Sequence, residues 1–497
     1  MEKKDEIVMG EELTKHATCG EGTVLVINHA GESPAEAAIS RAIETIGMGR
    51  YQYQLLFTCG FGFIVDQMLL ISISIVGPEA SLEFRPIRAT MLSSSLYAGL
   101  FIGAILCGFV ADAIGRKAVW MTSLFGLSIF TMAGAGCPSW AALNVFVALQ
   151  GLCGGGNLSI DLTVLAEVLP RKYSYLLTAL CCLWGFGSAV TGLVAWPLIV
   201  SFSCASAEGC VKSGNMAWRY IYIVLGALSL AMSIIRAVVM RMQESPKWLL
   251  SRGKFDEAVS AVQAIGKINR AEFDFVLDES LRTGNLQQRE SFGKHVSRLF
   301  TGPKRLRLMI CLALLWLMVG IGYPIYSIFL PYYLQSHGAH LGDGSAYLTY
   351  RDWAVSSVVG IFGPVAATVL IELPRLGRRG GMLIMAFACA IFAGLFTTVR
   401  NEGQNLGFSC MINFFLNGLY GIVYAYTPEV LPSQSRATGA GLLMACGRLA
   451  SMFTPFIATY ADVTSSVPIW VACGIFVAMG CVAAALPFDP IHWENLY

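Results

Sequence analysis

Long apolar runs alternate with short polar connections along most of the chain. A helix needs about 20 mostly apolar residues to cross a bilayer. Twelve runs meet this length, so the pattern predicts an all-α membrane protein with twelve transmembrane helices. The predicted spans are 54–77, 90–113, 118–136, 141–165, 177–200, 218–240, 308–331, 353–372, 381–399, 407–427, 440–459 and 467–487.

One long polar stretch divides the predicted spans into two groups of six. It separates the two helix bundles and defines the expected domain organisation. The predicted parts are a polar N-terminal segment (1–53), an N-terminal bundle (54–240), a central loop (241–307), a C-terminal bundle (308–487) and a tail (488–497).

Composition supports a membrane location. Of the 497 residues, 55% are hydrophobic and only 13% are charged, and the mean hydropathy is +0.61. Soluble globular proteins carry about 25% charged residues, so the composition excludes a soluble enzyme and a disordered scaffold. The net charge of +2 leaves no basic surface for nucleic acid.

The distribution of Lys and Arg predicts the orientation. With the N-terminus placed inside the cell, 26 of the 34 basic residues fall on the cytoplasmic side and 6 on the other side. Cytoplasmic loops of membrane proteins are enriched in these residues. We therefore expect both termini and the central loop in the cytoplasm, and we favour the plasma membrane over an internal membrane.

The two halves repeat each other at an offset of 262 residues. Gly115-Arg116-Lys117 superposes on Gly377-Arg378-Arg379, and the tetrapeptide at 167–170 is identical to that at 429–432. Parallel six-helix repeats are a transporter architecture with a central site between the halves. The fold prediction rests on this repeat.

The 15 cysteines show no spacing typical of a metal site, and we expect neither a metal nor a cofactor. Cys204 and Cys210 share one polar loop on the predicted non-cytoplasmic side. That side is oxidising at a cell surface, so a disulfide between them is favoured over two unpaired thiols.

The loop after the second span carries a specific motif. Residues 108–117 read G-x-x-x-D-x-x-G-R-K, which resembles the signature of the major facilitator superfamily. Gly108 permits close helix approach. The carboxylate of Asp112 can be stabilised by a neighbouring helix N-terminus or a cation, and Arg116 offers a planar fork to a carboxylate such as Glu167.

Further motifs narrow the resemblance. Residues 428–439 resemble the P-E-x-x-P-[ST]-x-x-R-x-x-G of the sugar porter branch, and 244–250 resemble the start of its central loop. Residues 46–52 and 155–161 are similar to segments of transporters related to synaptic-vesicle proteins, the second to their fungal members. The resemblance implies a twelve-helix transporter that works by alternating access.

The resemblance also implies a set of gating residues, which in the family lock the outward-facing state. They are Gly108, Asp112, Gly115, Arg116, Lys117 and Glu167 in the first half, Glu244 in the central loop, and Glu372, Arg378, Arg379, Glu429 and Arg436 in the second half. Two departures stand out. Glu372 lies five residues before Gly377, with Pro374 in the insertion, and Ser174 occupies the place that matches Arg436. The two gates are therefore expected to differ in strength.

Ionisable residues within spans are costly unless they face a cavity or a partner. Asp66, in the first span, is either a proton or substrate group in a cavity or a structural carboxylate. Asn157 and Asp161 share one face of the fourth span and form either a substrate face or an interhelix hydrogen-bond pair. Arg448 needs a partner, either a carboxylate of the N-terminal half or helix-end carbonyls. Arg236 can extend to the membrane surface, and we assign it no role.

Tyr326 and Asn417 are the cavity candidates from the C-terminal half. We expect a secondary-active transporter of a small polar organic solute such as a sugar, polyol or carboxylate, with the lipid bilayer, the solute and protons as partners. No G-x-x-x-x-G-K-[ST] loop occurs, so ATP is not the expected energy source. Export of a secondary metabolite is an alternative, and a non-transporting nutrient receptor is an alternative of another class.

Overall fold

The computed structural model describes residues 34–487, except 90, 205–207, 241, 272–274, 278–296, 298, 337–345, 374, 432–434 and 461–466. For residues 323, 326–336, 346–350, 457–460 and 468 it describes the backbone only.

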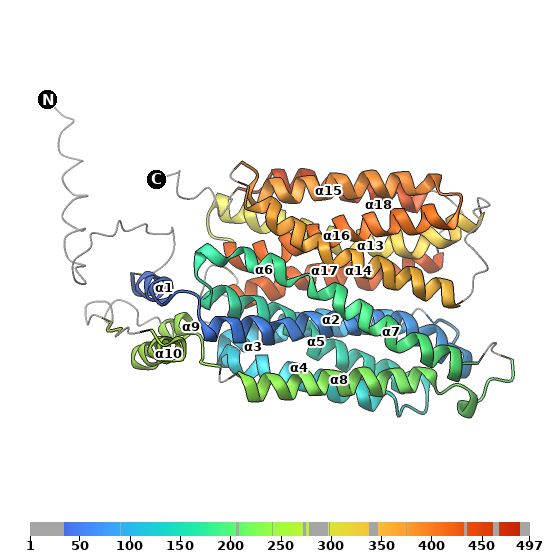
Figure 1. Cartoon of the computed structure of the whole chain (residues 1–497), viewed down its shortest axis with the longest axis horizontal. Coiled ribbons are helices and arrows are strands. Elements are labelled where there is room, and N and C mark those ends of the chain that lie inside the picture. The colour runs from blue at the N-terminus through green and yellow to red at the C-terminus, as the bar shows by residue number, and fades with distance from the viewer. Residues whose placement is uncertain are drawn as a thin grey trace.

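Twelve long helices run side by side along the molecule (Figure 1), as the sequence predicts. They are α2 (Arg50–Phe84), α3 (Met91–Ile114), α4 (Arg116–Gly134), α5 (Trp140–Val168), α7 (Leu183–Phe202) preceded by the short α6 (Tyr175–Leu180), α8 (Ala217–Val239), α13 (Pro303–Ser336), α14 (Ala346–Ile371), α15 (Gly377–Leu395), α16 (Glu402–Val430), α17 (Arg436–Tyr460) and α18 (Val467–Ala484).

By length and hydropathy, nine helical stretches of the described residues can cross a membrane. Within lipid, a helix satisfies its own backbone polar groups, which is why apolar runs of this length fold as helices. The nine do not include α4, α17 and α18, yet all three pack against helices of the nine.

The helices form two bundles, α2–α8 and α13–α18, one above the other in Figure 1. The bundles meet where α3 packs on α17 and α7 packs on α14. The 262-residue repeat is visible at the start of α4 and of α15. Gly115 and Gly377 both have positive φ there, 118° and 59°, a conformation that favours glycine.

Arg236 of α8 lies in the centre of the N-terminal bundle. Its guanidinium donates to Asp161 Oδ1 (2.9 Å), Asn157 Oδ1 (3.0 Å) and the carbonyl oxygens of Trp120 (3.1 Å) and Thr58 (3.0 and 3.2 Å). The Trp120 ring lies 4.2 Å from the guanidinium carbon, and its Nε1 donates to Asp161 Oδ1 at 2.5 Å. One arginine therefore ties α2, α4, α5 and α8 together.

Two sequence-based interpretations are corrected by this network. Arg236 does not extend to the membrane surface, because its side chain is 1% exposed and all its donors are used inside the bundle. Asn157 and Asp161 take part in interhelix hydrogen bonds, the second of the two alternatives: each accepts from Arg236 of α8, Asp161 also accepts from Trp120 of α4, and within α5 Asn157 Nδ2 donates to Asp161 Oδ2 at 3.1 Å. A side chain with this many partners is a structural element.

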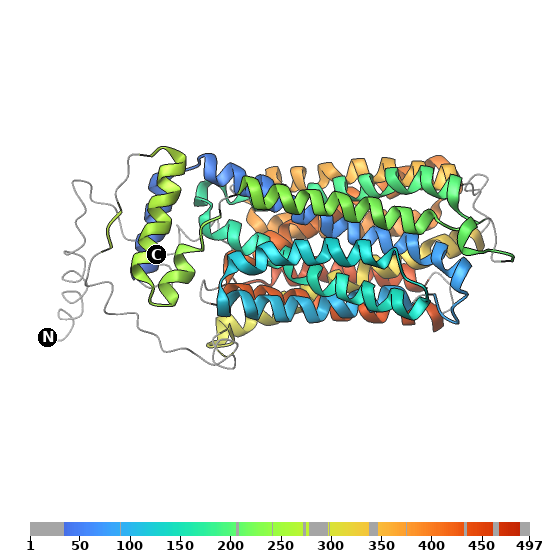
Figure 2. The ribbon, with the colours of Figure 1, turned by 90° about the horizontal axis from the view of Figure 1, so that it is seen from below.

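Three shorter helices gather at one end of the bundles, namely α1 (Pro34–Ile46), α9 (Pro246–Ser251) and α10 (Phe255–Asn269) (Figure 2). They show that the N-terminal segment and the central loop are partly helical. Asn269 binds the start of α2: its Oδ1 accepts from Tyr51 N (2.9 Å) and its Nδ2 donates to Gln52 Oε1 (2.8 Å). A Cβ on Gly49 would lie 2.2 Å from Asn269 Cγ, which explains the glycine in this motif.

The structure contains the disulfide that the sequence favours. Cys204 and Cys210 are bonded in the loop between α7 and α8, at the end of the molecule opposite α9 and α10. The other described cysteines are free, and most lie within the helices.

The buried network makes a prediction about stability. Arg236→Leu leaves the Asp161 carboxylate buried without its cation, and loss of one partner of a buried pair costs about 3–5 kcal/mol. We expect a markedly lower midpoint of thermal unfolding for the detergent-solubilised protein, measured by fluorescence-detected gel filtration.

Two variants control this experiment. Lys254→Ala, on the exposed surface of α10, should leave the midpoint unchanged. The double variant Asp161→Leu with Arg236→Leu should recover much of the loss, because neither charge is then buried alone. An unchanged midpoint in Arg236→Leu would show that the network adds nothing to stability.

Candidate functional site

A cavity of about 740 Å³ lies between the two bundles. Its walls come from α2, α3 and α7 of the N-terminal bundle and from α13, α14, α16 and α17 of the C-terminal bundle. The lining runs from Asp66, in the middle of α2, through Ser81 to Ala89 in the α2–α3 connection. The cavity therefore extends toward the end of the molecule opposite α9 and α10.

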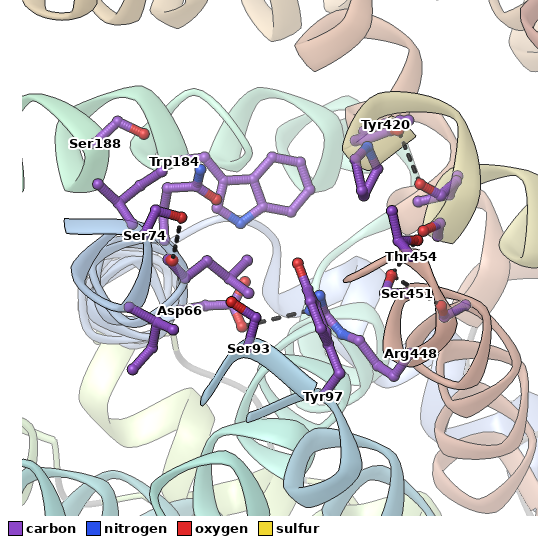
Figure 3. Close-up of a pocket in the computed structure, with 18 of the residues that line it drawn as sticks. Asp66, Ser74, Ser93, Tyr97, Trp184, Ser188, Tyr420, Arg448, Ser451 and Thr454 are labelled. Atoms are coloured by element: carbon purple, nitrogen blue, oxygen red, sulfur yellow. Dashed lines mark hydrogen bonds and ion pairs between the residues drawn. The ribbon is translucent and has the colours of Figure 1, made fainter. Parts of the chain in front are cut away.

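Asp66 and Arg448 are the one acid and the one base among the described lining residues. Asp66 Oδ1 lies 3.6 Å from Arg448 Nη2, and the side chains are 5% and 15% exposed (Figure 3). The pair joins α2 to α17 and thus one bundle to the other. Of the two partners considered for Arg448, the structure has the carboxylate of the N-terminal half.

Aromatic side chains form much of the cavity wall. Tyr424 contacts Trp184 and Trp316 edge to face, with ring centroids 4.7 and 4.5 Å apart. Trp353, Tyr97 and Tyr420 also line the cavity. The sequence does not mark the tryptophans as cavity residues, because Trp and Tyr are also enriched at the membrane–water interfaces.

The other predicted cavity residues have different outcomes. Asn417 of α16 lines the cavity as expected. The side chain of Tyr326 lies outside the described residues. Asn157 and Asp161 are not among the lining residues that the structure describes, since Arg236, Trp120 and each other take up their polar atoms.

Several polar atoms at the cavity are buried without a hydrogen bond among the described residues. They are Trp184 Nε1, Trp353 Nε1, Thr454 Oγ1 and Asp66 Oδ1. Buried polar groups are nearly always hydrogen-bonded in folded proteins. Their concentration at one cavity therefore marks it as a ligand site.

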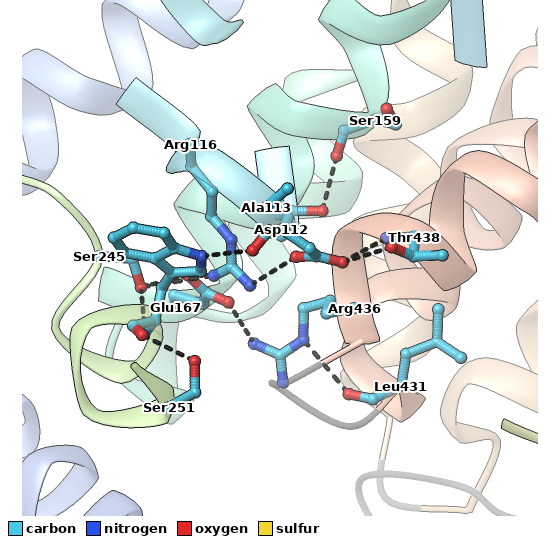
Figure 4. Close-up of polar contacts among 12 residues, drawn as sticks. Asp112, Ala113, Arg116, Ser159, Glu167, Ser245, Ser251, Leu431, Arg436 and Thr438 are labelled. Carbon is cyan, nitrogen blue, oxygen red and sulfur yellow. Dashed lines mark hydrogen bonds and ion pairs between the residues drawn. The ribbon is translucent and has the colours of Figure 1, made fainter. Parts of the chain in front are cut away.

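At the opposite end, near α9 and α10, the two bundles are joined by charged groups. Asp112 Oδ2, at the end of α3, accepts hydrogen bonds from Thr438 N and Oγ1, both at 2.7 Å (Figure 4). Thr438 lies in the first turn of α17, where backbone N–H groups are free and the helix dipole favours an anion. Asp112 is thus stabilised by a helix N-terminus, one of the two partners expected for it.

Glu167 of α5 is the second link between the bundles at this end. It contacts the Arg116 guanidinium on one side and lies 3.5 Å from Arg436 Nη1 of α17 on the other. Arg116 also lies 3.4 Å from Asp112. The resulting cluster buries two arginines between two carboxylates, so breaking it exposes or unpairs charge.

The start of the central loop braces this cluster. Glu244 accepts from the backbone N–H groups of Arg116 (2.9 Å) and Lys117 (3.3 and 3.4 Å), at the N-terminus of α4. Ser245 Oγ donates to Glu167 Oε2 at 2.5 Å. A Cβ on Gly115 would lie 2.6 Å from Glu244 Oε2, so this glycine also makes room for the brace.

The C-terminal bundle has a weaker counterpart. Arg378 binds both oxygens of Glu429 (2.7 and 3.0 Å) and donates to Ser174 Oγ of the N-terminal bundle at 3.2 Å. Glu372, in the place comparable to Asp112, is exposed at the end of α14, and Arg379 bonds the carbonyl of Ala484 within its own bundle. The two gates differ, as their sequences indicate.

Among the residues that the structure describes, no three or more His, Cys, Asp or Glu side chains come together as a possible metal site.

Two six-helix bundles around a central cavity define a membrane transporter of small solutes. The family model of the Major Facilitator Superfamily matches residues 55–455, and the chain belongs to this superfamily. The resemblance recognised in the sequence is therefore confirmed.

Three curated relatives show how broad this family is. The chain is 35% identical to "MFS siderochrome iron transporter 1" of the fungus Ceriporiopsis subvermispora (91% of this chain, 90% of the relative). It is 28% identical to "Niacin transporter NiaP" of Acinetobacter baylyi (84% and 89%). It is 24% identical to the human "Putative transporter SVOPL" (92% and 91%).

A solved structure shares the fold. The proton:xylose symporter XylE bound to 6-bromo-6-deoxy-D-glucose superposes with a TM-score of 0.65 at 17% identity, over 90% of this chain and 96% of that chain. At this identity the match supports the twelve-helix fold alone.

The two gates yield a matched pair of variants. Asp112→Asn removes the charge at the N-terminus of α17, and a hydrogen bond to a charged group contributes about 1.5–3 kcal/mol. We expect the closed end to open more often. The ratio of molecules open at this end to molecules open at the other end should rise about tenfold or more. A cysteine introduced in the cavity by Ser81→Cys should then react more slowly with a maleimide, and Glu372→Gln should leave that rate unchanged. Equal rates in wild type and Asp112→Asn would contradict the role of Asp112.

Proposed function

We propose that the protein is a proton-coupled secondary-active transporter of a small polar organic solute, and that it works by alternating access in the direction of uptake. The observation that carries the proposal is the ion pair between Asp66 and Arg448, at the inner end of a cavity between two bundles. The pair combines a group that can take up a proton with a cation that can bind substrate.

The two ends of the molecule support an alternating-access cycle. One end is sealed by Asp112, Glu167 and their partners on α17, while the cavity extends toward the other end. Reversal of this arrangement requires α17 to leave α3 and α5. Arg448 lies on α17, so the same movement would separate it from Asp66 on α2 and couple the ion pair to the gate.

Proton coupling follows from the partners of Asp66. Its carboxylate has one cation nearby and lines a cavity, so loss of the cation to a substrate or to a conformational change would favour protonation. A pH difference of one unit across the membrane supplies about 1.4 kcal/mol per proton carried. This energy can drive accumulation of a solute without ATP.

The names of the relatives support a small solute of some polarity. The solutes that they name differ from one relative to the next. Siderochrome iron, niacin and xylose differ in size and charge. The sugar-porter-like motifs of the sequence are consistent with uptake. The substrate itself must be sought in the chemistry of this cavity.

The role of Asp66 can be tested in proteoliposomes with wild type and Asp66→Asn. Radiolabelled nicotinate and xylose serve as probes, under an imposed pH gradient and in exchange without a gradient. We expect Asp66→Asn to lose gradient-driven accumulation by at least tenfold and to retain exchange, because the asparagine cannot carry a proton.

Glu372→Gln is the control, and it should retain both activities because Glu372 is exposed and remote from the cavity. Loss of accumulation and exchange together would assign Asp66 to substrate binding alone. Unaltered accumulation would remove it from the mechanism.

A further inference from the structure

We propose that the substrate is a small planar organic anion, an aromatic carboxylate in its simplest form, and that its carboxylate replaces Asp66 as the partner of Arg448. This inference rests on the proposed transport function and specifies its substrate class. It is carried by the balance of donors and acceptors at the cavity, the state of Arg448 and the aromatic walls.

Of the four buried polar atoms of the cavity without a hydrogen bond among the described residues, two are donors only, one hydroxyl can donate or accept, and Asp66 Oδ1 is an acceptor that lies beside Arg448. The indole N–H groups of Trp184 and Trp353 are donors only, and both are buried without an acceptor among the described residues. Thr454 Oγ1 is in the same state. A ligand that satisfies these groups must present several acceptor oxygens or nitrogens.

Arg448 adds charge to this donor excess. Its guanidinium approaches Asp66 only to 3.6 Å, and Asp66 Oδ1 accepts no hydrogen bond from the residues that the structure describes. By contrast, Arg236 makes hydrogen bonds with its whole guanidinium. Arg448 is therefore paired with Asp66 at a longer distance than a hydrogen bond, and its planar fork can exchange this partner for a ligand carboxylate bound through two parallel hydrogen bonds.

A sugar would make different use of this cavity, since it carries no charge to bind Arg448. Each hydroxyl of a sugar both donates and accepts, so a sugar site needs acceptors as well as donors. Asp66 is the one carboxylate among the described lining residues, and Gln67, Asn413 and Asn417 are the amides. The lining also has serine hydroxyls that can accept, such as Ser81, Ser356 and Ser451. An acceptor-rich ligand is therefore favoured by Arg448 and by the two indole N–H groups that have no acceptor among the described residues.

The walls favour a flat ligand. Trp184 and Tyr424 pack edge to face, and Tyr97 and Tyr420 border the same space as Asp66 and Arg448 (Figure 3). Aromatic rings pack well on one another in stacked and edge-to-face arrangements. A planar body can therefore lie among these rings while its carboxylate reaches Arg448.

Charge balance links the anion to a proton. When the carboxylate of the ligand binds Arg448, Asp66 would be left as a second negative group beside it, and like charges disfavour ionisation. Asp66 takes up one proton from the open side, so the loaded site has the same net charge as the unloaded one. One anion and one proton then move together, and the overall step carries no net charge.

Binding of matched probe pairs tests this inference. Benzoate with benzamide, and nicotinate with nicotinamide, differ in charge and hardly in shape. For the purified wild-type protein, isothermal titration calorimetry should show at least tenfold tighter binding of one or both carboxylates than of the matching amide. Trp353→Phe and Thr454→Val remove one donor each and should weaken carboxylate binding several-fold without changing the midpoint of unfolding.

Two further variants separate the charge from the fold. Arg448→Lys keeps a cation beside Asp66 but lacks the planar fork, and it should reduce the preference for the carboxylate. Trp470→Phe, at a position that is 56% exposed and outside the described lining, is the matched control for Trp353→Phe and should bind like wild type.

The outcomes also separate this inference from the proposed function. If each amide binds as tightly as its carboxylate, or if xylose but neither carboxylate accumulates under a pH gradient, the substrate class is wrong and the transport function stands. If Trp353→Phe and Thr454→Val both bind the carboxylates like wild type, the donor argument fails. Should no solute accumulate under any gradient, the proposed function fails as well.

Discussion

The ion pair between Asp66 and Arg448 connects the two halves of the molecule at the inner end of the cavity. A charge within the membrane needs a partner, and here each half supplies one charge. The pair lies within the membrane-spanning part, at the cavity and at the interface between the bundles. Any movement of α17 away from α2 changes the partner of Arg448, so the relative position of the bundles and the charge state of the cavity are linked.

A second buried ion pair, Asp161 with Arg236, shows by contrast why Asp66 and Arg448 can exchange partners. Asp161 and Arg236 lie within a single bundle and are surrounded by hydrogen bonds from Trp120 and Asn157. All members of that network move together, so it stabilises the N-terminal bundle as a rigid unit. Asp66 has an oxygen without a hydrogen bond among the described residues. Its contact with Arg448 can be lost at smaller cost.

The closed end of the molecule relies on different chemistry. Asp112 reaches from α3 to the first turn of α17, and Glu167 reaches from α5 to Arg436. Both contacts cross between the bundles, while Glu244 holds the start of α4 within the N-terminal bundle. In the C-terminal counterpart, Arg378 reaches Ser174 of the N-terminal bundle. The seal is therefore asymmetric, and the first half contributes most of its charge.

The sequence by itself determined the twelve helices, the two-bundle repeat, the gating motifs and the disulfide. These features depend on local properties, namely apolar length, a repeat of short motifs at helix ends and two cysteines in one loop. The sequence could not decide which membrane charges are structural. Asp66 and Asp161 are both lone acids within spans, and Arg236 and Arg448 are both lone arginines. Only the tertiary structure pairs Asp161 with Arg236 inside one bundle and Asp66 with Arg448 across two, because the partner of a buried charge is set by which helices pack together.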